Sequence, residues 1–116
     1  MKRISIIALT LVAAAASLPA AAAEGDVATK AQTCFACHGP NGAQPIAPNY
    51  PVLAGQYANY LEHALTEYKE GKRKNAIMGG QAAALSKEDI HALARFFADQ
   101  PGSLYTPSVH GELHTK

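Results

Sequence analysis

The sequence has only two cysteines and little charge, and each of these shortages excludes a class of protein. Charged residues make up 16% of the 116 residues, and the formal net charge is +1. Two cysteines cannot build a disulfide framework, and a zinc finger needs a second ligand pair at finger-like spacing, which is missing. A near-neutral chain offers no basic surface for nucleic acid. No alternating strand pattern or internal repeat appears, so helices are the regular structure that the pattern predicts.

One long apolar stretch is present, and it lies at the N-terminus. Two basic residues precede the Ala-rich stretch from Ile4 to Leu18, and Ala21-Ala22-Ala23 offers small residues before Glu24. This order is typical of a secretory signal peptide, so residues 1–23 are predicted to be removed on export. An uncleaved anchor fits the same pattern, although the stretch is short for a bilayer span. Cleavage would leave 93 residues with eight Lys plus Arg and nine Asp plus Glu, a net charge of −1, and no stable membrane insertion.

The two cysteines stand in the segment Cys34-Phe35-Ala36-Cys37-His38. Two thiols three residues apart, followed directly by an imidazole, form the attachment site of a c-type haem, in which the thiols form thioethers and the histidine binds iron. A structural disulfide and a thioredoxin-like dithiol are the alternatives, but the dithiol belongs in a βαβ context that the pattern lacks. We therefore predict one covalently bound haem c. A chain this small and Ala-rich is expected to use the porphyrin as part of its core.

The first predicted helix carries this motif. It runs from about Val27 to Cys37, with Asp26 as its N-cap, and it places Val27, Ala31 and Cys34 on one face. A Gly-Pro-Asn-Gly sequence that starts at Gly39 ends it. Three prolines then predict an extended, irregular stretch before the next helix.

Two further helices are predicted. The second runs from about Gln56 to Glu70 and stops at Gly71, and the third begins at Ser86, which with Asp89 resembles a capping box. The apolar stripe of the second helix consists of Tyr57, Tyr60, Leu61, Ala64, Leu65 and Tyr68. The buried face of the third, which ends before Pro101-Gly102, consists of Ile90, Leu93, Ala94 and Phe97.

Met78 is the only methionine that remains once the signal is removed. It is expected in a loop between the second and third helices, beside two glycines that allow close approach of the backbone. Its thioether is a candidate sixth iron ligand, and the alternative is a methionine that fills a gap in the core.

The histidines compete for that sixth position. His63 and His91 are expected on the surfaces of their helices, and His110 and His114 lie in the polar C-terminal tail. Bis-histidine coordination therefore remains open, chiefly through a tail that folds back onto the iron.

Four segments at matching spacing resemble the class I c-type cytochromes. They are Cys34-Phe35-Ala36-Cys37-His38-Gly39, Pro48-Asn49-Tyr50-Pro51-Val52-Leu53-Ala54-Gly55-Gln56, Gly71-Lys72-Arg73-Lys74-Asn75-Ala76-Ile77-Met78 and Leu85-Ser86-Lys87-Glu88-Asp89-Ile90. The likeness is strongest to the small bacterial periplasmic carriers of the cytochrome c-553 kind and to one half of the dihaem cytochrome c-four kind. Because it covers nearly all of residues 25–101, we predict a cytochrome c domain over 24–101 and a polar tail over 102–116.

The resemblance implies a fold and a set of site residues. The fold would be all-α, a class I cytochrome c fold in which about three main helices wrap around one covalently attached haem. His38 and Met78 would lie on opposite sides of the iron, the Pro51 carbonyl would accept from the other nitrogen of His38, and Leu53 would pack on the haem. Arg73 would meet a haem propionate, or it would be one of a solvated basic trio.

The function that the resemblance implies is one-electron transfer by a soluble periplasmic carrier, which is not an enzyme. Its partners would be redox proteins such as a membrane quinol-oxidising complex, a periplasmic dehydrogenase or a terminal oxidase, with no nucleic acid. A haem subunit of a larger periplasmic oxidoreductase, with residues 102–116 as its docking segment, is one alternative. A ligand-binding sensor haem is the other, if Met78 does not ligate.

Overall fold

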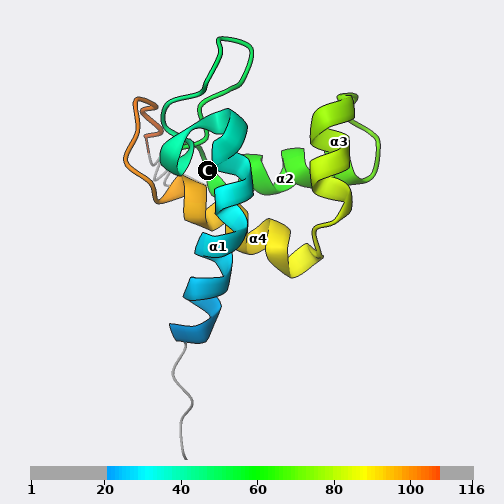
Figure 1. The fold of residues 1–116 in the computed structure, drawn as a ribbon, viewed down its shortest axis with the longest axis horizontal. Helices are drawn as coiled ribbons and strands as arrows, with labels where there is room; N and C mark the ends of the chain where they lie inside the picture. Colours follow the sequence, from blue (N-terminus) through cyan, green and yellow to red (C-terminus); the bar gives the residue numbers. More distant parts are fainter. Residues whose placement is uncertain (1–20, 108–116) are drawn as a thin grey trace, which may run out of the picture.

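The computed structural model describes residues 21–107, and the only regular structure in this part of the chain is helical. The elements are α1 (Ala21–His38), the 3₁₀ turn η1 (Pro40–Gly42), α2 (Ala58–Lys69), α3 (Ala76–Ala83) and α4 (Lys87–Ala98). Helix α4 packs against both α1 and α2, and α3 packs against the end of α2 that lies far from α1 (Figure 1). The prediction of an all-α fold is confirmed.

Helix α1 begins further upstream than the sequence suggested. It runs through Asp26, so the predicted N-cap is wrong, and the Asp26 carboxylate instead pairs with Lys30 one turn later at 2.6 Å. The predicted cleavage point before Glu24 falls in the first turn of this helix, while residues 1–20 of the predicted signal lie outside the described residues. Gly39 ends the helix with a φ of 76°, a conformation that glycine adopts without strain.

Helix α4 follows its sequence prediction closely. Ser86 is the N-cap, its hydroxyl accepts from the Asp89 N–H at 3.0 Å, and the Asp89 carboxylate accepts from the Ser86 N–H at 3.0 Å, which completes the capping box. The predicted inner face is buried, with exposures of 3% or less at Ile90, Leu93, Ala94 and Phe97.

The core lies where α1 crosses α4. Ala31 is fully buried on α1 and packs with Leu93 and Phe97 of α4, as the predicted face of α1 requires. Phe35 joins the edge of this core, with its ring centroid 6.1 Å from that of Phe97 and 6.3 Å from that of Phe96. Close contact at the crossing depends on small residues, because Ala31 and Ala94 are both completely covered.

Helix α2 confirms only part of its predicted stripe. Leu61 is buried at 7% exposure, whereas Tyr57 and Tyr60 are 43% and 47% exposed. Tyr57 is exposed because the helix starts at Ala58, so this residue precedes the first turn and its hydroxyl reaches the C-terminal segment instead of the core. Gly71, with a φ of 71°, terminates the helix as expected.

Helix α3 was not expected, because its sequence contains Gly79 and Gly80, which are unfavourable in helices. The Asn75 side chain caps it by accepting from the Met78 N–H at 2.9 Å. Lys69 of α2 also donates to the carbonyl of Ala83, the last residue of α3, and to that of Leu85 just beyond it. A cap and tertiary contacts therefore maintain a helix of low intrinsic propensity.

An ion-pair network joins α1 to α4. The Lys30 ammonium lies 2.6 Å from a carboxylate oxygen of Asp26 and 2.6 Å from one of Asp89. These pairs raise the pKa of Lys30 to about 12, with the hydrogen bond to Asp26 as the largest cause. The hydrogen bonds from Lys30 and from Ser86 lower the pKa of Asp89 to about 2.

We predict that Asp89→Asn will remove a contribution to folding stability that is present at neutral pH and lost in acid. Because the folded-state pKa of Asp89 is lowered from 3.8 to about 2, its contribution is present above pH 3.8 and is lost as the pH falls toward 2. Thermal melts should show Asp89→Asn melting below the parent protein at pH 7 and together with it near pH 2. Glu88→Gln is the matched control, since it removes the same charge one residue away from the network, and an equal loss in that variant would contradict the assignment.

Candidate functional site

The cysteines of the motif lie one turn apart near the end of α1. Both are free thiols and both are partly buried. Burial raises the pKa of the Cys34 thiol above its ordinary value. A redox dithiol relies on a lowered thiol pKa, so this environment argues against the thioredoxin-like alternative.

His38 is the buried polar residue at the end of α1. It is 5% exposed, and its Nδ1 lies 2.8 Å from the carbonyl oxygen of Pro51. A carbonyl can only accept, so Nδ1 carries the proton and donates it to Pro51. In the neutral ring this leaves the lone pair on Nε2, which is the nitrogen that can bind a metal. The contact that the resemblance implied between these two residues is therefore present in the structure.

The loop after α1 brings Pro51 to this position. The Ile46 N–H donates to the Cys37 carbonyl at 3.1 Å, and the Leu53 N–H donates to the Gly42 carbonyl at 2.8 Å. Gly42 has a φ of 74°, and a Cβ at this position would lie 2.8 Å from the Phe97 ring. The turn therefore requires glycine here, both for its conformation and for lack of space.

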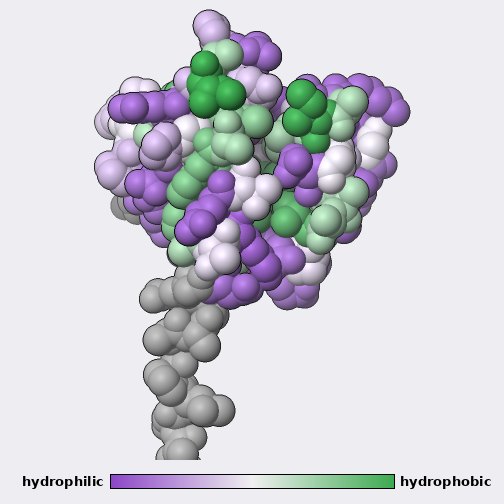
Figure 2. All heavy atoms as spheres, viewed as in Figure 1, coloured by the Kyte–Doolittle hydropathy of each residue, from purple (hydrophilic) through white to green (hydrophobic). Residues whose placement is uncertain are grey.

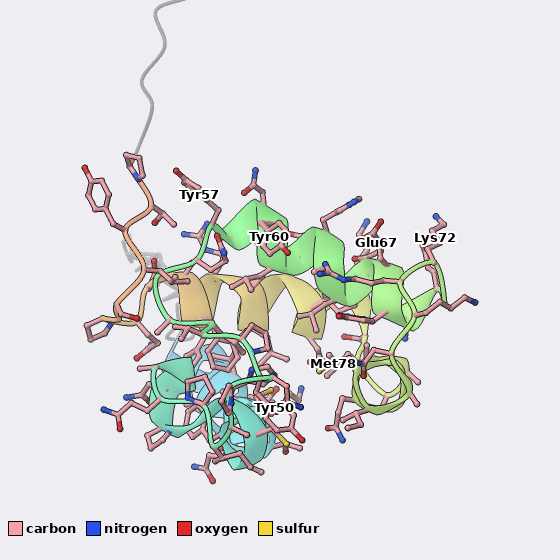
Figure 3. All side chains as sticks on the ribbon, turned by 90° about the horizontal axis from the view of Figure 1, so that it is seen from above. Tyr50, Tyr57, Tyr60, Glu67, Lys72 and Met78 are labelled. Atoms are coloured by element: carbon pink, nitrogen blue, oxygen red, sulfur yellow. The ribbon has the colours of Figure 1, made fainter. Side chains whose placement is uncertain are left out.

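Met78 lies in the first turn of α3 and not in a loop, so the predicted loop setting is wrong. It is half-buried, and the Asn75 cap fixes its backbone N–H. Figure 3 shows Met78 on the side of α3 that faces Tyr50, while Tyr57 and Lys72 point away from the space between them. Tyr50 in turn packs edge-on against the His38 ring, with the centroids 6.1 Å apart. Sequence reasoning missed the Asn75 cap and the contact of Tyr50 with His38. An Asn directly before Ala-Ile-Met was the available signal for the cap.

Leu53 and Arg73 have different surroundings. Leu53 is partly buried and packs against the core cluster that also contacts Cys34. Arg73 is exposed, and its guanidinium carbon lies 5.1 Å from the centre of the Tyr68 ring, with one nitrogen 3.5 Å from the Tyr60 hydroxyl. Arg73 therefore rests on α2, and its propionate role stays a prediction.

The histidines of α2 and α4 lie on the surface, as expected. His63 is 73% exposed and lies 3.3 Å from Glu67, and His91 is 59% exposed and lies 3.0 Å from Glu62. His110 and His114 lie outside the described residues. Within residues 21–107, no three His, Cys, Asp or Glu side chains gather as a metal site would require. A single histidine beside two thiols suits haem, because the porphyrin nitrogens would supply most of the iron ligands.

The surface around the motif also fits an apolar prosthetic group. Figure 2 shows a hollow between the part of the surface formed by the chain after α1 and the part formed by α3, with hydrophobic residues on both sides. Ile46 of that loop is 66% exposed and Ile77 of α3 is 54% exposed. Single exposed apolar residues are ordinary, but apolar residues that gather on both sides of one hollow are expected to have a nonpolar partner. Together with the His38 tautomer and the paired thiols, they fit a covalently attached porphyrin.

An all-α fold with these thiols and this histidine defines a c-type cytochrome of class I. The chain belongs to the cytochrome c family, whose family model, described as "Cytochrome c", matches residues 22–100. The family implies electron transfer by a c-type haem that is covalently bound, and Cys34 and Cys37 are the cysteines available to hold it.

Individual relatives agree with this assignment. Cytochrome c-554(548) of Halomonas halodenitrificans is 45% identical over 82 residues, which cover 66% of this chain and 98% of that protein. The thiosulfate dehydrogenase electron acceptor of Stutzerimonas stutzeri is 42% identical over 69 residues, or 57% of this chain and 32% of that protein. The crystal structure of reduced recombinant cytochrome c4 from Pseudomonas stutzeri matches with a TM-score of 0.57 and 32% identity, over 66% of this chain and 50% of that one. The chain thus spans half or less of the last two proteins.

Proposed function

We propose that the mature chain is a periplasmic one-electron carrier whose haem is attached through Cys34 and Cys37 and ligated by His38 and Met78. The observation that carries this proposal is the buried His38 ring, which donates through Nδ1 to the Pro51 carbonyl at 2.8 Å and so keeps Nε2 free beside the two thiols. A c-type haem, when bound, supplies reversible one-electron oxidation and reduction of its iron.

The residues of the chain have three tasks in this proposal. The thiols of Cys34 and Cys37 anchor the group through thioethers. The bond to Pro51 orients the His38 ring and strengthens it as a ligand. The apolar side chains of Leu53 and Ile77 exclude water, which favours the less charged ferrous state and so raises the potential.

Met78 is proposed as the second axial ligand because of its placement. It is the methionine of the mature sequence, it is half-buried, and it faces the Tyr50 side of the site. A thioether opposite a histidine raises the potential relative to two histidines. With both axial positions filled, the iron has no open site for a substrate, which supports a carrier and not an enzyme.

The location and partners rest on separate observations. The N-terminal pattern of basic, apolar and small residues supports export. Among the described helices, none has both the length and the apolar character needed to cross a bilayer. Because one relative is named as an electron acceptor of thiosulfate dehydrogenase, we propose a periplasmic dehydrogenase as one class of donor for this chain.

Intact mass spectrometry of the exported, denatured protein tests the attachment. We expect a polypeptide that begins near Glu24 plus the mass of one haem, and no loss of haem on extraction with acidified organic solvent. The control is the same chain without residues 1–23, produced in the cytoplasm, which should remain unmodified. An exported chain with unmodified cysteines, or with haem that extracts freely, would refute the proposal.

A further inference from the structure

The segment after α4 does not leave the domain but packs back onto it. We call residues 101–107 the C-terminal strap. The Thr106 hydroxyl donates to the Gly55 carbonyl at 2.7 Å, and the Tyr57 hydroxyl donates to the Pro107 carbonyl at 2.7 Å. Both bonds join residues at least 50 positions apart, so they are tertiary contacts and not part of a local turn. The strap thus binds the short segment that follows Pro51.

Gly102 shows how closely the strap approaches that segment. A Cβ at Gly102 would lie 2.6 Å from the Ala54 carbonyl oxygen and 2.8 Å from the Ala54 Cβ. Ala54 is itself fully buried. A Cβ at Gly55, where φ is 78°, would lie 3.2 Å from the carbonyl oxygen of Leu104. Any side chain at Gly102 must therefore displace the strap or the 53–55 backbone.

The same segment is held from the other side by η1 and α4. The Gly42 carbonyl accepts from the N–H groups of Leu53 at 2.8 Å and Ala54 at 3.1 Å, and the Phe97 carbonyl accepts from the Gly55 N–H at 3.0 Å. Residues 53–55 are therefore clamped between the body of the domain and the strap. Pro51, two residues before the clamp, is exposed.

We propose that the C-terminal strap is a positioning element for the iron ligand, because it fixes the backbone that carries the Pro51 carbonyl against His38. This inference rests on the proposed function, in which His38 ligates the haem. The bond from Nδ1–H to this carbonyl makes the imidazole more basic. A hydrogen bond weakens steeply when its distance and angle change, so a looser strap gives a weaker ligand. Thr106 and Gly102 act through Pro51 and are positioning residues.

Thr106→Val is the first test, since it keeps the shape of the side chain and removes the hydroxyl donor. In the haem-bound protein we expect the reduction potential to shift to a more positive value, because a less basic histidine stabilises ferric iron less. We also expect the His38 Nδ1–H to exchange with solvent about 3- to 10-fold faster, because the free energy of one ordinary hydrogen bond corresponds to a factor of this size. NMR of the reduced protein would measure this exchange rate. Gly102→Ala should shift both readouts in the same direction and further.

Two controls separate this role from general stability. Thr106→Ser keeps the hydroxyl and should retain the parent potential and exchange rate. Tyr105→Phe changes the neighbouring strap residue, which is 88% exposed, and should leave both unchanged. If Thr106→Val melts at a lower temperature but keeps the parent potential and exchange rate, the strap only stabilises the fold and the inference is wrong. That result would leave the proposed function intact. A parent protein without covalent haem would refute both the proposed function and the inference about the strap.

Discussion

A Cys34→Ala, Cys37→Ala double variant is expected to lose its haem and with it most of its cooperative folding. The buried hydrophobic residues of the described chain are eight, and four of them are alanines. The four larger ones are Leu61, Ile90, Leu93 and Phe97, with exposures between 2% and 7%. A core of this size is marginal for a small domain, and the porphyrin is expected to supply the missing apolar contacts.

The contacts between elements show which parts would come apart. Helices α1, α2 and α4 share the cluster around Leu61, Leu93 and Phe97, whereas α3 packs chiefly on α2. Among the described residues, Ile46 and Ile77 are large apolar side chains that stay 66% and 54% exposed. Without haem, the loop after α1 and helix α3 therefore lose their shared apolar contact.

Far-UV circular dichroism and thermal melting will measure this effect. We expect the double variant to retain some helix, with a weak and broad transition instead of a sharp one. Thr33→Ala is the control, because it makes a similar change at an exposed position of α1 and leaves the thiols in place. A sharp melt of the double variant close to that of the haem-bound protein would show that the polypeptide supplies its own core.

Sequence reasoning succeeded where the structure is determined by local chemistry. The boundaries of α4 follow from the Ser86–Asp89 capping box and from apolar residues at helical spacing, and both are visible in the sequence. The haem motif is equally local, because the thiols and the imidazole of Cys34, Cys37 and His38 must be adjacent for their chemistry. The Pro51 contact came from the family resemblance and not from any pattern in the residues.

The features that were missed depend on contacts between distant residues. Helix α3 contains two glycines, and its stabilising contacts come from the Asn75 cap and from Lys69 of α2. The predicted cap at Asp26 was wrong because α1 continues upstream, where the sequence had suggested a cleaved signal. The packing of Thr106 on Gly55 spans 51 residues, and no local pattern encodes it.

Met78→Ala is expected to leave the haem attached and to open the sixth coordination position. Attachment depends on Cys34 and Cys37, which this substitution does not touch. Axial ligands set haem potentials over a range of roughly 0.8 V, so loss of the thioether should lower the potential by an amount on the order of 0.1 V. The reduced variant should bind carbon monoxide at neutral pH, which the parent protein should not do.

Helix α3 allows this prediction to be tested in steps. Asn75→Ala removes the cap that fixes the Met78 N–H, so it should weaken ligation by this residue without abolishing it and give a smaller fall in potential. Gln81→Ala is the matched control, since it shortens an exposed side chain of the same helix and keeps both the thioether and the apolar side chains near the site. Absorption spectra and redox titration of the three variants should therefore rank Met78→Ala, Asn75→Ala and Gln81→Ala in order of decreasing effect. If Met78→Ala keeps the parent spectrum and potential, the sixth ligand lies elsewhere, and His110 and His114 become the leading candidates.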